Sequence, residues 1–140
     1  MSEIFKNADN TSATGKDFDV IIIGAGFAGM YMLHRMREMG LKSIVFEAGD
    51  GVGGTWYWNR YPGARCDVES VQYSYQFDKE LEQEWTWSEK YSPQPEILKY
   101  ANHVADRFKL RKDIRLNTRI TSSNYDEEKT EWEVVAEQGD

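Results

Sequence analysis

A glycine-rich loop between a short apolar run and a helical pattern is the feature that most constrains how this chain can fold. The run from Phe18 to Ile23 is rich in branched residues, which is typical of a buried parallel strand. It leads into a loop with Gly24, Gly26 and Gly29. The first glycine permits a tight turn, the second lets phosphates approach the backbone, and the third brings helix and strand close together. The sequence therefore predicts a strand, a turn and a helix whose N-terminal amides bind a dinucleotide.

An acidic residue at the end of a second predicted strand narrows the choice of dinucleotide. The predicted helix begins at Phe27 and ends before Gly40, and the strand Lys42–Glu47 follows it. Glu47 lies 23 residues beyond Gly24. A carboxylate there accepts hydrogen bonds from the ribose hydroxyls and repels a 2′-phosphate, which favours FAD or NAD over NADP. A solvated glutamate at a strand end is the structural alternative.

The remaining pattern predicts a single α/β domain with a Rossmann-like fold. The first helix has five residues near one face, namely Ala28, Tyr31, Met32, Arg35 and Met39. Residues 48–95 form a long aromatic stretch without clear periodicity, and a loop of that length is usually functional. After it we expect a helix and three strands, at Pro95–Phe108, Ile114–Asn117, Arg119–Tyr125 and Trp132–Ala136. Residues 1–17 are polar and are expected to be a flexible leader, which leaves 18–140 as the domain.

Composition excludes several classes of function. The formal net charge of -7 argues against a nucleic-acid partner, since such binding needs clustered Lys and Arg. No apolar run approaches the roughly 20 residues that span a bilayer, so no membrane association is expected. Cys66 is the only cysteine, and His34 and His103 are far apart, so the sequence offers no metal site. The expected compartment is the cytoplasm.

The segment from Gly53 to Ser70 is more specific than the glycine loop, and it resembles the corresponding part of Baeyer-Villiger monooxygenases. The likeness continues in Gln83–Trp85, at Tyr91, and in Gln94–Leu98 and Val104–Phe108. Its Gly53–Gly54 pair, after the acidic residue, is shared by flavoproteins with two dinucleotide-binding domains and favours FAD. The resemblance implies an enzyme that uses FAD, NADPH and O2 to insert oxygen beside a ketone carbonyl, giving an ester or lactone. Members that act on aryl ketones, steroids and large cyclic ketones look most similar.

The same resemblance implies roles for individual residues. Asp67 would be the catalytic residue, near the isoalloxazine ring and bonded to an active-site arginine outside this chain. Arg65 would also lie near the nicotinamide of NADPH. The implied cofactor contacts are Gly24, Gly26, Phe27, Ala28, Gly29, Glu47, Gly53, Gly54, Thr55, Trp56, Tyr57, Trp58, Arg65, Asp67, Tyr73 and Ile120. Read without the family, Trp56 and Trp58 could equally be packing aromatics, and Asp67 a turn residue.

Parts of the family pattern are missing from the sequence. There is no second glycine-rich loop for NADPH, no candidate for the catalytic arginine, and no strand that returns to lie beside the first one. The expectation is therefore a partial FAD-binding domain of a larger enzyme, whose remainder would be its partner. A stand-alone FAD-binding module without oxygenase activity is an alternative. A related monooxygenase that oxidises nitrogen or sulfur is another.

Overall fold

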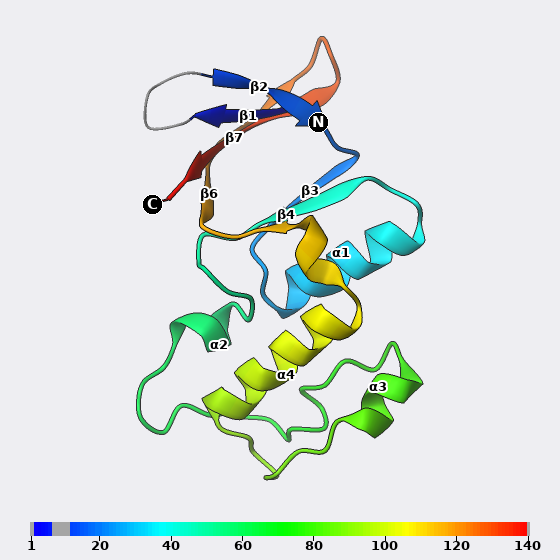
Figure 1. The fold of residues 1–140 in the computed structure, drawn as a ribbon, viewed down its shortest axis with the longest axis vertical. Helices are drawn as coiled ribbons and strands as arrows, with labels where there is room; N and C mark the ends of the chain where they lie inside the picture. The colour runs from blue at the N-terminus through cyan, green and yellow to red at the C-terminus, as the bar shows by residue number, and fades with distance from the viewer. Residues whose placement is uncertain (1, 7–11, 140) are drawn as a thin grey trace.

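A small parallel sheet with a helix crossing between its first two strands forms the centre of the molecule (Figure 1). The computed structural model describes residues 2–6 and 12–139. The sheet has the order β3-β4-β5, and all of its strands are parallel. Its strands are β3 (Val20–Ile23), β4 (Ser43–Phe46) and β5 (Ile114–Arg115), and α1 (Phe27–Glu38) connects the first two. The predicted strand-helix-strand unit is thus confirmed.

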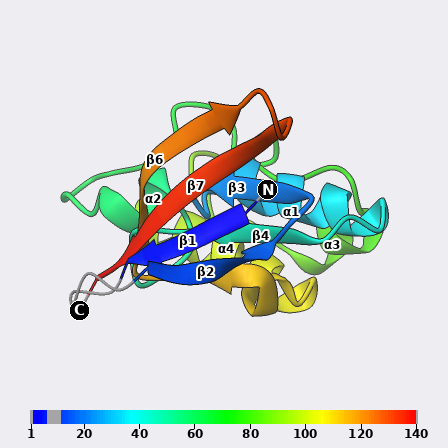
Figure 2. The ribbon, with the colours of Figure 1, turned by 90° about the horizontal axis from the view of Figure 1, so that it is seen from above.

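A second sheet covers the face of β3 and β4 opposite the helices (Figure 2). Its order is β2-β1-β7-β6. The strands are β1 (Ser2–Lys6), β2 (Ser12–Asp17), β6 (Thr118–Asp126) and β7 (Glu131–Gln138). The last two form an antiparallel hairpin where the sequence predicts one, with longer strands than expected.

The residues expected to be a flexible leader include β1 and β2, two neighbouring strands of this second sheet. Strand β1 pairs in parallel with β7, from Ser2 opposite Glu133 to Lys6 opposite Glu137, and β2 pairs with β1. The edge of β7 would otherwise present unpaired N–H and C=O groups. Backbone pairing with such an edge does not need apolar side chains, so the polar composition of residues 1–17 did not indicate strands there.

The two faces of the parallel sheet contribute to two different cores. Ile22 and Val45 belong to the core on the helical side, which α1 and α4 (Gln94–Arg107) complete. Ile44 and Phe46 pack on the other side, against Ala136 of the second sheet. Alternate residues of β4 therefore point to opposite faces, and both faces are covered, which explains the continuous apolar sequence of the strand.

The orientation of α1 differs from the face that its sequence pattern indicates. The buried residues are Gly29, Met30 and Leu33, whereas the predicted set is exposed, namely Ala28, Tyr31, Met32, Arg35 and Met39. Gly29 must face the end of β3, because it contacts the backbone there, and this contact fixes the rotation of the helix. The predicted helix Pro95–Phe108 is confirmed as α4, whose apolar side buries Ile97, Ala101 and Val104.

The stretch expected to be one long loop contains two short helices, α2 (Thr55–Trp58) and α3 (Lys79–Glu84). The Asp78 carboxylate caps α3 by accepting from the Leu81 amide at 2.7 Å. Arg107 of α4 forms ion pairs with Asp78 and with Glu84 at the other end of α3. A 3-10 helix, η1 (Leu110–Asp113), then leads into β5. Helices of four to six residues are too short to leave a periodic signal in the sequence.

Residues 2–6 and 12–139 contain neither a candidate membrane span nor a candidate metal cluster. None of their helices is long and apolar enough to cross a membrane. Over the same residues, no group of three or more His, Cys, Asp or Glu side chains is placed to hold a metal ion.

The contact between Gly29 and the end of β3 generates a stability prediction. A Cβ added at Gly29 would lie 1.9 Å from the carbonyl oxygen of Gly24, which is backbone and cannot rotate away. We expect Gly29→Ala to lower the free energy of unfolding by about 1–3 kcal/mol or more, despite the higher helix propensity of alanine. Urea unfolding of the chain measures the change.

Met32→Ala is the matched control, because Met32 lies on the exposed side of the same helix. It should change the free energy of unfolding by no more than about 0.5 kcal/mol. Equal stabilities for Gly29→Ala and the unsubstituted chain would contradict the close contact.

Candidate dinucleotide site

A cavity of about 430 Å³ opens where the carboxyl ends of β3 and β4 meet the first turn of α2. In open α/β sheets this edge is where ligands bind, and the volume lies within the range of small-molecule sites. Seven predicted cofactor residues line it: Gly24, Gly26, Glu47, Gly54, Thr55, Trp58 and Ile120. The structure thus brings together residues that are up to 96 positions apart in the sequence.

The turn from β3 into α1 has the geometry that the first and third glycines predict. Gly24 adopts a φ of 92°, a left-handed conformation that side chains disfavour, and its amide donates to the Phe46 carbonyl at 2.7 Å. Gly29 packs directly on the Gly24 carbonyl. The N-terminus of α1 is therefore held close to the end of β3.

Gly26 and Gly54 form a cradle of bare backbone. A Cβ on Gly54 would lie 2.8 Å from the Gly26 Cα, and the two turns are tied by the Gly53 amide, which donates to the Ala25 carbonyl at 2.9 Å. Gly26 is the N-cap of α1 and makes no side-chain cap hydrogen bond. Its neighbouring amides and the positive end of the helix dipole suit a pyrophosphate, so the residues present fit a dinucleotide.

Glu47 is buried, with 4% of its surface exposed, and its carboxylate joins two backbone turns. Its Oε2 accepts from the Ala25 amide at 2.7 Å, and its Oε1 accepts from the Gly49 amide at 2.8 Å. A carboxylate has about four acceptor positions, so each oxygen keeps one for a ligand hydroxyl. The alternative of a solvated strand end is excluded by this burial.

The residues of α2 divide between the cavity and the protein interior. Thr55 and Trp58 line the cavity, and Trp58 is 57% exposed. Trp56 is buried, and its indole N–H donates to the Tyr73 hydroxyl at 2.8 Å. Tyr57 packs on the turn that follows Glu47. Trp56, Tyr57 and Tyr73 are thus outside the set that lines this cavity, although all were expected beside the cofactor.

Phe27 and Ala28 line a different hollow, of about 570 Å³, together with Tyr31, Tyr75 and Phe77 and neighbouring residues. The Tyr75 hydroxyl donates to the Phe27 carbonyl at 2.5 Å. Burial is the main cause that raises the pKa of Tyr75, so the phenol remains a donor at neutral pH. This hydroxyl holds the first turn of α1 through the Phe27 carbonyl.

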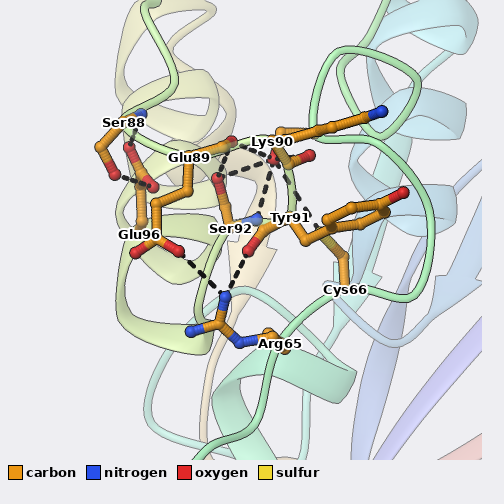
Figure 3. Close-up of polar contacts among 9 residues, drawn as sticks. Arg65, Cys66, Ser88, Glu89, Lys90, Tyr91, Ser92 and Glu96 are labelled. Carbon is orange, nitrogen blue, oxygen red and sulfur yellow. Dashed lines mark hydrogen bonds and ion pairs between the residues drawn. The ribbon is translucent and has the colours of Figure 1, made fainter.

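Arg65 lies on a separate loop that is fastened to residues 88–94 (Figure 3), and Asp67 follows it by two positions. The Arg65 guanidinium donates to the Glu89 carboxylate and to the Tyr91 carbonyl, both at 2.9 Å. Ser70, with 2% of its surface exposed, accepts from the Ser92 amide at 2.8 Å. Asp67 is exposed. The structure does not bring Arg65 or Asp67 to the cavity.

Sequence reasoning missed six residues that line the cavity: Ile23, Phe46, Ala48, Asn59, Thr118 and Arg119. Ile23, Phe46 and Ala48 are adjacent to predicted site residues at the strand ends, so their position was available from the sequence. Thr118 and Arg119 come from the start of β6, and only the fold brings them there.

Comparison with known proteins agrees with this geometry. The family model described as an NAD(P)-binding Rossmann-like domain matches residues 22–103, from β3 into α4. Phenazine N-monooxygenase PhzNO1 of Lysobacter antibioticus is 52% identical over 124 residues, which are 88% of this chain and 23% of the relative. A Baeyer-Villiger monooxygenase of Pseudooceanicola batsensis is 45% identical over 133 residues, which are 94% of this chain and 24% of the relative.

Solved structures give the same result. The structure described as oxidized steroid monooxygenase bound to NADP matches with a TM-score of 0.84 and 60% identity, over 87% of this chain and 25% of its own. OTEMO in an FAD-bound form matches with a TM-score of 0.81 and 47% identity, over 85% of this chain and 22% of its own. The likeness to Baeyer-Villiger monooxygenases is confirmed, and the chain spans about a quarter of the length of these relatives.

The two hydrogen bonds to Glu47 predict a cost for a neutral replacement. In Glu47→Gln, one oxygen becomes an amide N–H2 that faces a backbone N–H, so a buried donor loses its acceptor. We expect the free energy of unfolding to fall by about 1–3 kcal/mol. Urea unfolding checks this, with Glu127→Gln as a control because Glu127 is exposed in the β6–β7 turn. A Glu47→Gln variant as stable as the control would show that the carboxylate does not bridge the two turns.

Proposed function

Because this chain belongs to the family of NAD(P)-binding Rossmann-like domains, we propose that it binds FAD and supplies the FAD-binding part of a Baeyer-Villiger monooxygenase. The observation that carries the proposal is the backbone cradle of Gly26 and Gly54, with the Glu47 carboxylate at one end of the same cavity. The cradle accounts for a pyrophosphate and the carboxylate for a ribose. The segment from Gly53 to Ser70 and the names of the relatives favour FAD over NAD.

Each part of the cofactor has residues that would hold it. The amides from Gly26 to Ala28 would bind the pyrophosphate, and the free acceptor positions of Glu47 would bind the adenosine ribose. Ile120 lines the same cavity, two residues after Thr118, whose amide donates to the Glu47 carbonyl, and it would contact the adenine. Thr55 and Trp58 would line the path of the flavin half, where an indole ring gives a flat apolar surface.

In the complete enzyme, bound FAD would supply two-electron chemistry, with NADPH as reductant and O2 and a ketone as the other substrates. This chain's residues would bind and orient that cofactor. Asp67 is exposed on a loop that Arg65, Ser70 and Ser92 fasten in place, so its carboxylate is available to a basic group from elsewhere in the enzyme. That availability supports the catalytic role implied for Asp67. The proposed compartment of the enzyme is the cytoplasm.

Nitrogen oxidation is a second candidate for the complete enzyme. The observation that favours it is the 52% identity to phenazine N-monooxygenase PhzNO1, which is as high as the identities to several ketone-oxidising relatives. Binding of FAD by this chain is common to both candidates. A module that binds FAD without any oxygenase activity is the third.

Gly26→Ala tests the cradle directly. Gly26 has a φ of -76°, which alanine adopts without strain, and the added Cβ would lie 3.4 Å from the Gly54 Cα, an ordinary contact distance. The methyl group would instead occupy the space where the pyrophosphate approaches. We expect FAD affinity to fall by about tenfold or more, while the urea unfolding midpoint stays close to that of the unsubstituted chain. Quenching of flavin fluorescence measures the affinity.

Gly139→Ala is the control, because its Cβ would meet only the Asn117 carbonyl at 3.6 Å. It should leave FAD affinity unchanged. If the unsubstituted chain fails to quench flavin fluorescence at high micromolar concentration, or if Gly26→Ala binds FAD as tightly as the control, the proposed binding mode is wrong.

The reaction is tested on the full reading frame that contains this chain. Purified with FAD, the enzyme should consume NADPH faster when a cyclic or aryl ketone is added, and mass spectrometry should detect an ester or lactone that carries one oxygen atom from 18O2. N-oxide formation from phenazine without ester formation from any ketone would favour the second candidate. NADPH oxidation with no oxygenated product would reject both.

A further inference from the structure

The turn after Glu47 has two glycines, Gly49 and Gly51, where the Tyr57 ring contacts the backbone. A Cβ added at Gly49 would lie 2.6 Å from the Tyr57 ring, and one at Gly51 would lie 3.1 Å from it. The Tyr57 ring therefore packs flat on residues 49–51. No larger side chain fits at Gly49 unless the ring moves.

The partly exposed Tyr57 side chain is held by contacts with Asp50 and Arg60. Its hydroxyl donates to the Asp50 carboxylate at 2.6 Å and accepts from the Asp50 amide at 3.3 Å. The bond to the carboxylate is the main cause that raises the pKa of Tyr57, so the phenol keeps its proton at neutral pH. The Arg60 guanidinium lies 4.8 Å from the ring centroid, and its Nε donates to the Tyr57 carbonyl at 2.7 Å. Tyr57 is thus tied to the turn by its ring and by its hydroxyl.

One hydrogen bond connects this turn to the Glu47 carboxylate, which lines the cavity. The Gly49 amide, under the Tyr57 ring, donates to Glu47 Oε1, and the Gly49 carbonyl accepts from the Asn117 amide at 2.9 Å. Both amide and carbonyl of Gly49 are therefore fixed. Any movement of the turn would move one of the two donors that orient the Glu47 carboxylate.

We propose that Tyr57 is a positioning residue for Glu47: by clamping residues 49–51 it fixes the carboxylate so that the site selects dinucleotides whose adenosine ribose carries a free 2′-hydroxyl. The inference rests on the proposed dinucleotide binding and gives Tyr57 a role other than contact with the flavin. A fixed carboxylate discriminates because it accepts from the ribose hydroxyls at set positions and repels a phosphate there. A carboxylate free to swing aside would lose both effects.

The experiment compares two probes that carry the adenosine half alone, ADP-ribose and 2′-phospho-ADP-ribose, by calorimetric titration of the 140-residue chain. The unsubstituted chain should prefer ADP-ribose by about tenfold or more. In Tyr57→Leu the affinity for ADP-ribose should fall about tenfold while that for the 2′-phosphate changes little, so the ratio approaches one. Tyr57→Phe keeps the ring but loses the bonds to Asp50, and its ratio should lie between the two.

Two further variants make the outcome decisive. Tyr61→Leu is the control, since Tyr61 is 64% exposed on the next turn, and its ratio should match that of the unsubstituted chain. If Tyr57→Leu does not fold, Asp50→Ala tests the same clamp, because Asp50 is exposed and its side chain holds the Tyr57 hydroxyl.

Each outcome points to one conclusion. An equal loss of affinity for both probes, or an unchanged ratio in a folded variant, would overturn the role of Tyr57 and leave the proposed function standing. Failure of the unsubstituted chain to bind ADP-ribose and FAD would overturn the proposed function and this role with it.

Discussion

The buried carboxylate of Glu47 joins two turns of backbone, and the dinucleotide cavity depends on that junction. One oxygen accepts from Ala25, in the loop after β3, and the other accepts from Gly49, in the turn after β4. Burying a carboxylate is costly unless hydrogen bonds compensate, and here two amides do so. The same group that would recognise a ribose therefore also sets the distance between the two strand ends. Stability and ligand recognition are not separable at this residue.

Glycine has a different purpose at each position around this junction, which explains how much the sequence could reveal. Gly24 has a left-handed conformation, Gly29 permits a backbone contact, and Gly26 and Gly54 let two turns pack backbone to backbone beside the cavity. These are local requirements of a strand-turn-helix unit, so the spacing alone predicted the unit and its carboxyl-end cavity correctly. The core side of α4 was predictable for a similar reason, since helical periodicity records which face is buried.

What the sequence could not reveal depends on contacts between distant segments. The rotation of α1 follows from the contact of Gly29 with Gly24, not from the distribution of its apolar residues. The strands β1 and β2 form because β7 offers an edge, and Thr118 and Arg119 reach the cavity because β6 starts beside Glu47. The resemblance to the family implies that Trp56, Tyr57 and Tyr73 contact the cofactor. A resemblance in sequence does not distinguish residues that contact a ligand from residues that position those contacts. The bond between Trp56 and Tyr73 and the packing of Tyr57 on Gly49 make that distinction.

The same distinction explains why relatives with different reactions share this region so closely. An N-oxidising relative at 52% identity and a steroid monooxygenase at 60% match 88% and 87% of this chain. In the proposed binding mode, the residues that line the cavity would contact a phosphate, a ribose and a flat ring, which are parts of the cofactor. Enzymes with different reactions would then share this region because they share a cofactor, whose chemistry is common to those reactions. The choice between carbon and nitrogen as the oxidised atom would come from residues that contact the substrate.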